Sequence, residues 1–280
     1  MNYNKDMKML ILDCVILALR EDIGSGDITT DAIVPAETKI SANIIAKEEG
    51  IICGLLIAKL VFLSVDKTVE FTDKAKDGKL VKKGAVVATV KGPARGILTA
   101  ERTALNFLQR LSGIATMTNK FVKAAGKDVK ILDTRKTTPG LRYLEKYAVK
   151  MGGGFNHRLG LYDAVLIKSN HVSIAGGVKT AVDLARKKYG WVEIEAKTPG
   201  QVRDAVGCGA SRIMLDNMSI ADIRRSIKLV RASKRKIEIE VSGGIAFSNI
   251  RNIARTGVDF ISIGALTHSA PALDISLKVV

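Results

Sequence analysis

The sequence predicts an α/β protein whose larger part is a closed or nearly closed β/α barrel. Beyond residue 125, short apolar segments alternate with helical segments at a spacing of roughly 25 residues, which is typical of serial β-α-β units. The apolar segments are bounded by glycine, proline or helix-forming stretches, as buried parallel strands are. A doubly wound open sheet is the alternative. Neither a Gly-x-Gly-x-x-Gly nor a P-loop motif follows any of the segments, so dinucleotide and P-loop binding lose their main support.

The N-terminal part predicts one helix and a small α+β domain. The apolar residues 9–19 are too short to span a bilayer and are interrupted by an acid, so we expect an amphipathic helix packed on its own domain. Strand-like segments follow at residues 40–46, 68–71 and 86–90, with a helical segment at residues 54–63 between them.

A long helix is predicted from residue 93 to residue 123. Thr99 is a plausible N-cap, and Glu101 lies where the positive start of a helix favours an acid. On this prediction Arg102 lies in the first turn, near the end of the helix.

The barrel elements follow in order. Strands are predicted at residues 129–132, 163–167, 192–196, 211–215, 237–241 and 259–263. Helices are predicted between them, at residues 178–188, 199–206, 219–232 and 248–256. Because reactive groups of α/β barrels gather at the carboxyl ends of the strands, the residues that follow each strand are the first candidates for function.

The charge balance favours an anionic ligand. With 44 Lys and Arg against 28 Asp and Glu, the net charge of +16 suits nucleic acid, acidic membranes or phosphorylated metabolites. Aromatic residues make up only 5% of the chain, so stacking platforms for nucleic acid are sparse, and we expect neither a nucleic-acid nor a membrane partner. The three cysteines lie far apart, which predicts no disulfide framework and favours the reducing cytoplasm.

Cationic side chains cluster after two predicted strands and one glycine-rich turn. Arginine matches a carboxylate with two parallel hydrogen bonds, so several such donors predict a ligand that carries carboxylates as well as phosphate. The candidates are Arg135, Lys136, His157, Arg158 and Lys168, with Arg102 as a further donor. A structural or helix-capping role is the alternative for His157.

Two late loops predict a phosphate site. Ser242-Gly243-Gly244 follows one strand and Gly264-Ala265 follows the next, and paired late loops are the recurrent phosphate-binding feature of β/α barrels. His268 lies beside the second loop.

Two carboxylates at neighbouring strand ends predict a metal site. Glu195 and Asp216 suit Mg²⁺ held jointly with substrate phosphates and water. The alternative is that they pair with nearby Lys or Arg. Glu193, Glu238 and Glu240 are further acids on these strands, and some of them are expected to balance buried cations.

Taken together, these motifs resemble the quinolinate phosphoribosyltransferase family over nearly the whole chain. The most specific blocks are Asp133-Thr-Arg-Lys-Thr-Thr-Pro-Gly140 and Ala265-Leu-Thr-His-Ser269. The other matching segments are residues 21–30, 92–95, 99–115, 156–158, 214–217 and 270–276. One departure is Ser169, since many members have Asp after the lysine that corresponds to Lys168.

The resemblance implies a fold and a reaction. It implies an N-terminal α/β sandwich domain at residues 1–112, completed by the tail at residues 268–280, and an open seven-stranded α/β barrel at residues 113–267. It further implies that quinolinate and 5-phosphoribosyl 1-pyrophosphate, with Mg²⁺, give nicotinate mononucleotide, pyrophosphate and carbon dioxide for NAD synthesis. A cytoplasmic homodimer is implied, with a hexamer as the alternative.

The resemblance also implies a role for each candidate residue. Arg135, His157, Arg158 and Lys168 would hold the quinolinate carboxylates, with Arg102 supplied by the neighbouring subunit. The implied catalytic residues are Lys136, Lys168, Glu195 and Asp216, of which Glu195 and Asp216 would also serve the metal. The remaining implied substrate contacts, at the phosphate loops and near Arg135, are Thr134, Ser242, Gly243, Gly244, Ile263, Gly264, Ala265 and His268.

Two rival functions remain at this point. A paralogous phosphoribosyltransferase of the same fold could act on another pyridine or azole acid. A basic nucleic-acid-binding protein is the rival of a different class, and it predicts salt-sensitive binding to any duplex.

Overall fold

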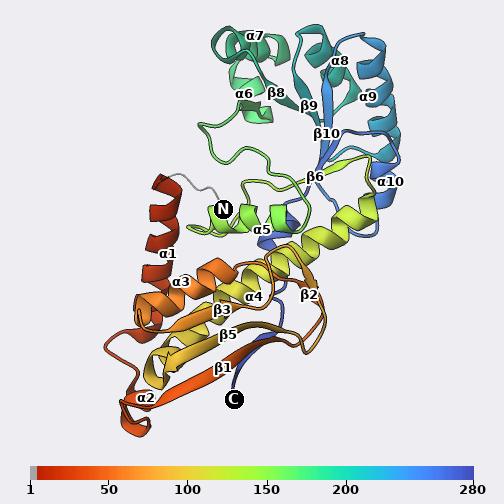
Figure 1. Ribbon diagram of the computed structural model, residues 1–280. Helices are drawn as coiled ribbons and strands as arrows, with labels where there is room; N and C mark the ends of the chain where they lie inside the picture. Colours follow the sequence, from red (N-terminus) through yellow and green to blue (C-terminus); the bar gives the residue numbers. More distant parts are fainter. Residues whose placement is uncertain (1–4) are drawn as a thin grey trace. The chain divides into compact units, whose positions relative to one another are not determined.

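The computed structural model describes residues 5–280, which form two compact units (Figure 1). The first unit holds the described residues up to Asn119 together with Thr137–Gly153 and Leu266–Val280. The second unit holds Lys120–Lys136 and Gly154–Ala265.

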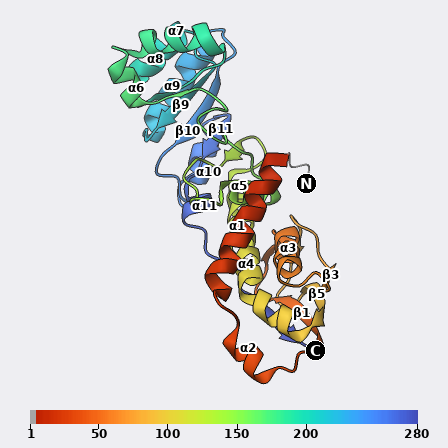
Figure 2. The same cartoon turned by 90° about the vertical axis from the view of Figure 1, so that its left-hand side faces the viewer.

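The first unit contains an antiparallel sheet in the order β12-β1-β5-β3. Figures 1 and 2 show helices α3 and α4 packed beside this sheet. Its buried core includes Ile44 of β1, Ile57 and Phe62 of α3, and Leu108 and Leu111 of α4. The strands are β1 (Lys39–Ala46), β3 (Glu70–Asp73), β5 (Val86–Pro93) and β12 (Ile275–Val279), with a separate pair β2 (Gly50–Ile51) and β4 (Leu80–Val81). The helices are α1 (Lys5–Ile23), α2 (Ile28–Ile33), α3 (Leu55–Val65), α4 (Ala94–Ala125) and α5 (Arg142–Met151).

The C-terminal tail completes the first sheet. Strand β12 pairs antiparallel with β1, with Leu277 opposite Ile44. A Cβ atom on Gly113 of α4 would lie 1.9 Å from the carbonyl oxygen of Pro271, so only glycine allows the tail to pass this close to the helix.

The segment Thr137–Gly153 belongs to a different unit from the one predicted. The prediction placed it in the barrel, at residues 113–267, whereas the structure groups it with the first unit. Buried Glu145 of α5 accepts a hydrogen bond from Nη2 of Arg110 at 2.8 Å, and the amide of Asn119 donates to the carbonyl of Gly152 at 3.2 Å. These contacts with α4 fix α5 in the first unit.

Helix α4 begins at Ala94, directly after β5 and close to the predicted start at residue 93, but well before the predicted cap at Thr99. Thr99 is therefore an interior residue, and its hydroxyl lies 3.2 Å from Oδ2 of Asp27, the N-cap of α2. Arg102 lies well inside the helix and not in its first turn. The predicted cap was wrong because strand β5 runs into the helix without a loop.

The second unit is a parallel sheet in the order β6-β11-β10-β9-β8-β7, and all six predicted strands are present. Phe155 adds an isolated parallel bridge to Leu132 on the outer side of β6, in the place of a seventh strand. The strands are β6 (Lys130–Leu132), β7 (Leu166–Ile167), β8 (Glu193–Ala196), β9 (Arg212–Asp216), β10 (Glu238–Ser242) and β11 (Phe260–Ser262). The helices are α6 (Ser169–Ile174), α7 (Val178–Tyr189), α8 (Pro199–Gly207), α9 (Ile220–Ala232) and α10 (Ile250–Ala254). The short helix α11 (Ala265–His268) begins at the last residue of this unit, and its remaining residues belong to the first unit.

Helices α7, α8 and α9 lie next to one another along this sheet (Figures 1 and 2). Helix α6 was not predicted, and α10 is shorter than the predicted helix at residues 248–256. Across residues 5–280, no helix combines the length and the apolar character that a membrane crossing needs.

Candidate active site

The carboxyl ends of the parallel strands bring most of the predicted site residues together. Asp216 ends β9 and lies opposite Ser242, which ends β10 and lies opposite Ser262 of β11. Glu195 lies on β8, next to β9, and Lys168 directly follows β7. Adjacent parallel strands thus place a lysine, two carboxylates and a glycine-rich loop at one edge of the second unit.

Arg135 and Arg158 bring two guanidinium groups to this edge. Arg158 is half-buried, and Nη1 donates to the carbonyl of Ala164 at 3.0 Å. Burial lowers the pKa of Arg158, and the charge of nearby Arg135 lowers it further. Two guanidinium groups that interact in this way repel one another, so the arrangement is suited to a ligand with more than one negative charge.

Lys168 adds a third cation, paired with a predicted metal ligand. Its Nζ atom lies 2.6 Å from Oε1 of Glu195. The Lys168 side chain is 49% exposed, so its ammonium group can also reach a ligand in solvent. Its main-chain N–H donates to Nδ1 of His171 at 3.0 Å, which holds the start of α6 and thereby the lysine backbone.

Asp133 is a functional candidate that the sequence analysis missed. Its carboxylate is completely buried. One oxygen accepts the main-chain N–H of His157 at 2.9 Å and the other accepts the Asn156 amide at 2.5 Å. Asp133 therefore ties the Asn156-His157-Arg158 loop to the end of β6. The sequence feature that could have identified Asp133 is its position, directly after a predicted strand and at the start of the Asp-Thr-Arg-Lys motif.

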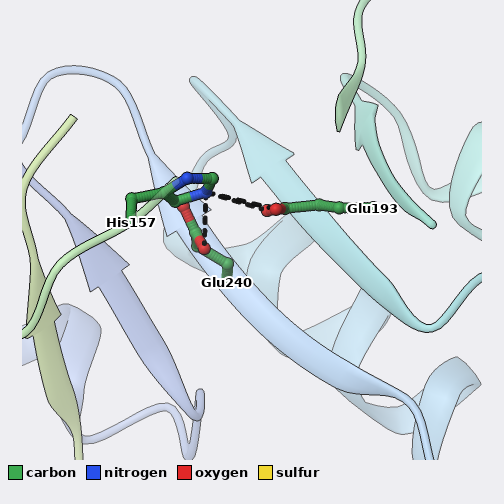
Figure 3. Close-up of side chains that lie close together, drawn as sticks. All are labelled: His157, Glu193 and Glu240. Atoms are coloured by element: carbon green, nitrogen blue, oxygen red, sulfur yellow. Dashed lines mark hydrogen bonds and ion pairs between the residues drawn. The ribbon is translucent and has the colours of Figure 1, made fainter. Parts of the chain in front are cut away.

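His157 lies in a buried cluster with Glu193 and Glu240 (Figure 3). Its Nε2 atom is 3.1 Å from Glu193 Oε2 and 3.5 Å from Glu240 Oε2. Its Nδ1 atom accepts the main-chain N–H of Arg158 at 2.8 Å. The resemblance implied a direct contact with a substrate carboxylate, whereas the structure turns Nε2 toward two protein carboxylates.

The groups of this cluster shift one another's pKa values because they lie close together away from water. Burial acts to lower the pKa of His157, but Glu193 and Glu240 outweigh it and raise the pKa to about 9. Burial raises the pKa of Glu193 to about 6. Burial also acts to raise the pKa of Glu240, but His157 and other partners outweigh it and lower that pKa. Because Nδ1 accepts a hydrogen bond from the Arg158 main chain, Nε2 is the ring nitrogen that faces the two carboxylates.

The expectation that strand acids balance buried cations is confirmed for β10. Arg212 lies across from that strand, with Nη2 2.7 Å from Glu238 Oε2 and Nη1 3.3 Å from Glu240 Oε2. Glu240 thus faces both Arg212 and His157, whereas Glu238 lies at the more exposed end of the strand.

The predicted phosphate loop is rigid. Gly243 and Gly244 have φ angles of 89° and 61°, which favour glycine. A Cβ atom on Gly243 would lie 2.3 Å from Oδ1 of Asn217. The Asn217 main chain donates to the Ser242 carbonyl at 2.9 Å, and the Asn249 side chain donates to the Gly244 carbonyl at 2.8 Å. The loop amides are therefore held in place before a ligand binds.

Glu195 and Asp216 fit a magnesium ion that is bound mainly by its other ligands. They are oxygen donors on adjacent strands, and Asp216 Oδ1 accepts the Asn217 amide at 3.1 Å. Among residues 5–280, neither belongs to a group of three closely spaced metal-binding side chains. Two carboxylates supplemented by phosphate oxygens and water are a usual set for Mg²⁺.

The other predicted residues lie as follows. Thr134 accepts the main-chain N–H of Lys136 on its hydroxyl at 3.0 Å, directly beside Arg135. Ile263 donates to the Leu132 carbonyl at 2.9 Å, which joins the second loop, with Gly264 and Ala265, to the end of β6. Arg102 and His268 belong to the first unit, so they are not among the residues that the second unit brings together.

Comparison with known proteins gives a consistent result. The family described as quinolinate phosphoribosyl transferase matches through its N-terminal domain at residues 27–112 and its C-terminal domain at residues 114–278. A Bacillus subtilis protein named probable nicotinate-nucleotide pyrophosphorylase (carboxylating) is 46% identical over 263 residues, covering 92% of this chain and 90% of that protein. The structure of the nicotinate-nucleotide pyrophosphorylase from Francisella tularensis superimposes with a TM-score of 0.92 at 44% identity, covering 97% of this chain and 96% of that chain.

Proposed function

The chain belongs to the quinolinate phosphoribosyltransferase family, and we propose that it converts quinolinate and 5-phosphoribosyl 1-pyrophosphate to nicotinate mononucleotide, pyrophosphate and carbon dioxide in NAD biosynthesis. The observation that carries this proposal is a group of three cations: Arg135 follows β6, Arg158 lies in the loop that Asp133 ties to β6, and Lys168 follows β7. Quinolinate has two adjacent carboxylates, and this cationic group matches them.

The reaction follows from the placement of charge. Arg135, Arg158 and Lys168 orient the pyridine ring through its carboxylates, and the amides of the Ser242-Gly243-Gly244 loop hold the 5-phosphate. Pyrophosphate departs from the ribose with its bonding electrons, and Lys136 stabilises the negative charge that develops. When bound by Glu195 and Asp216 together with phosphate oxygens and water, Mg²⁺ supplies further positive charge to the leaving group.

The pyridine nitrogen then bonds to the ribose carbon and becomes cationic. The cationic ring draws electrons from its bond to the 2-carboxylate, carbon dioxide leaves, and the ring carbon takes up a proton. No residue is needed as a base to start this sequence, because the pyridine nitrogen attacks with its own lone pair.

The first experiment compares quinolinate with nicotinate as acceptor, each with the phosphoribosyl donor and Mg²⁺. We expect equal amounts of carbon dioxide and pyrophosphate from quinolinate, and no carbon dioxide from nicotinate, which lacks the 2-carboxylate. Pyrophosphate release from another pyridine or azole acid, with none from quinolinate, would identify a paralogue with a different acceptor.

A homodimer with Arg102 donated between subunits is part of this proposal. The second unit has a largely apolar groove of about 930 Å³ beside β7, the end strand of its sheet, lined by Tyr162, Leu184 and Trp191 among others. In the first unit, helix α1 exposes several apolar side chains, namely Met9, Leu10, Leu12 and Leu17. Exposed apolar surface of this kind supports association with a second copy. A hexamer would be built from such dimers.

Mixed dimers test this arrangement. A dimer with Arg102→Ala in one subunit and Lys168→Ala in the other keeps one intact site if Arg102 acts across the interface, so about half of the wild-type activity per dimer is expected. The matched control combines Lys168→Ala with Glu195→Ala, which spoils both sites and is expected to stay inactive. If the Arg102→Ala mixture is as inactive as the control, Arg102 acts within its own subunit.

We also propose that the protein works in the cytoplasm. Its three cysteines, Cys14, Cys53 and Cys208, are all unbridged, as expected in a reducing compartment.

A further inference from the structure

The burial of the two carboxylates in the cluster of His157, Glu193 and Glu240 requires an explanation, because both are almost completely inaccessible to water. Glu193 is 1% exposed and Glu240 is 0% exposed. Glu193 is on β8 and Glu240 is on β10, the two strands on either side of β9. Burying two carboxylates in this way is costly unless specific partners compensate. The reaction described above assigns no role to either glutamate.

The geometry fixes the tautomer of the His157 ring. A main-chain N–H can only donate, so Nδ1, which lies 2.8 Å from the Arg158 nitrogen, must be the unprotonated nitrogen. The ring proton is therefore on Nε2, where it faces the two glutamates at 3.1 and 3.5 Å. The glutamates select the tautomer that accepts the Arg158 amide.

Through the imidazole ring, the glutamates act on Arg158, which is proposed to bind a carboxylate of the substrate. The backbone of the loop is held on one side by Asp133, which accepts the His157 N–H at 2.9 Å. On the other side, His157 Nδ1 holds the next N–H, that of Arg158. With both amides held, the Arg158 side chain leaves the loop from a fixed position, and its guanidinium group is anchored on the Ala164 carbonyl.

We propose that Glu193 and Glu240 are positioning residues that, through the imidazole of His157, hold Arg158 in place to bind a carboxylate of the substrate. The inference rests on the proposed function for the identity of that substrate. The cluster itself, and the tautomer it selects, do not depend on it.

A metal ion is the other use that a histidine and two carboxylates could serve. Nε2 would then have to offer its lone pair to the metal, which moves the ring proton to Nδ1. There it would point at the hydrogen of the Arg158 amide. The observed contact at Nδ1 therefore favours the positioning role over metal binding.

Kinetic constants of three single variants test the proposal. We expect Glu193→Gln and Glu240→Gln each to raise the KM for quinolinate about tenfold, because a charge-assisted hydrogen bond to His157 is replaced by a neutral one. The KM for the phosphoribosyl donor should stay within about twofold of the wild-type value. Glu238→Gln is the matched control, since Glu238 lies on β10 together with Glu240 and pairs with Arg212. It should leave both KM values unchanged.

A fold defect would give a different pattern. It would reduce the active fraction and kcat while leaving both KM values alone, so the split between the two substrates separates positioning from simple destabilisation. An unchanged KM for quinolinate in both folded glutamate variants would overturn the proposal.

A spectroscopic measurement tests the ring without any assay of activity. The chain has only three histidines, so the ring ¹⁵N signals can be assigned with His171→Gln and His268→Gln variants. We expect His157 to carry its proton on Nε2 in the wild type, and this preference to weaken in the Glu193→Gln/Glu240→Gln double variant. A proton on Nδ1 in the wild type, or a stoichiometric metal lost in His157→Gln, would overturn the proposal. If the wild type fails to use quinolinate, only the proposed function is overturned, because the position of the ring proton of His157 is measured without substrate.

Discussion

Replacing Arg135 with alanine is expected to lower kcat/KM for quinolinate by about a thousandfold, since truncating one partner of a desolvated charge pair typically costs several kcal/mol. Arg135 lies close enough to Arg158 to lower its pKa, so we expect the two guanidinium groups to bind one anionic ligand together. On the proposed function, removing Arg135 leaves one substrate carboxylate without its bidentate donor, and Arg158 alone is not expected to hold both carboxylates. Steady-state kinetics with quinolinate as the varied substrate gives the effect directly.

Two further variants make the result interpretable. Arg135→Lys keeps the charge but loses the planar fork, so we expect an intermediate loss, of about thirtyfold. Arg251→Ala removes an exposed arginine of helix α10 in the same unit and is expected to leave both activity and melting temperature unchanged. Near-wild-type turnover of a folded Arg135→Ala protein would show that the carboxylate site lies elsewhere.

The sequence was sufficient to predict the barrel because its strands are short, buried and regularly spaced. Even β7, which is reduced to Leu166 and Ile167, was recovered within the predicted segment 163–167. The segment Thr137–Gly153 could not be placed in this way. Its position depends on the pairing of Arg110 with buried Glu145, and nothing in the local pattern of either helix reveals that long-range contact.

The charged half of the site was predictable for the same reason. Lys168, Asp216 and Ser242 directly follow predicted strands, Glu195 lies one residue before the end of another, and the parallel register brings them to one edge. Asp133, Glu193 and Glu240 were harder. An acid on a strand is equally compatible with a solvated edge and with a buried cluster. Only the three-dimensional position of His157 between β8 and β10 shows which applies (Figure 3).

Gly243→Ala is expected to raise the KM for 5-phosphoribosyl 1-pyrophosphate about a hundredfold. The added methyl group would lie 2.3 Å from Oδ1 of Asn217, so this side chain must move. Asn217 donates to Asp216 through its amide and to Ser242 through its main chain, so its displacement disturbs a proposed metal ligand and the phosphate loop together. Losing two or more such contacts accounts for an effect of about 3 kcal/mol.

Gly257→Ala separates this displacement from backbone strain. Gly257 has a φ angle of 88°, almost the same as the 89° of Gly243, but a Cβ atom there would meet nothing within 4 Å. Both variants should therefore lose about 1 kcal/mol of stability from the left-handed backbone, as measured by denaturant unfolding. Only Gly243→Ala should also lose affinity for the phosphoribosyl donor, with the KM for quinolinate much less affected. If the loop holds the phosphate, the movement of Asn217 must weaken binding of the donor. Equal donor binding by the two variants would therefore show that the Ser242-Gly243-Gly244 loop does not hold the phosphate.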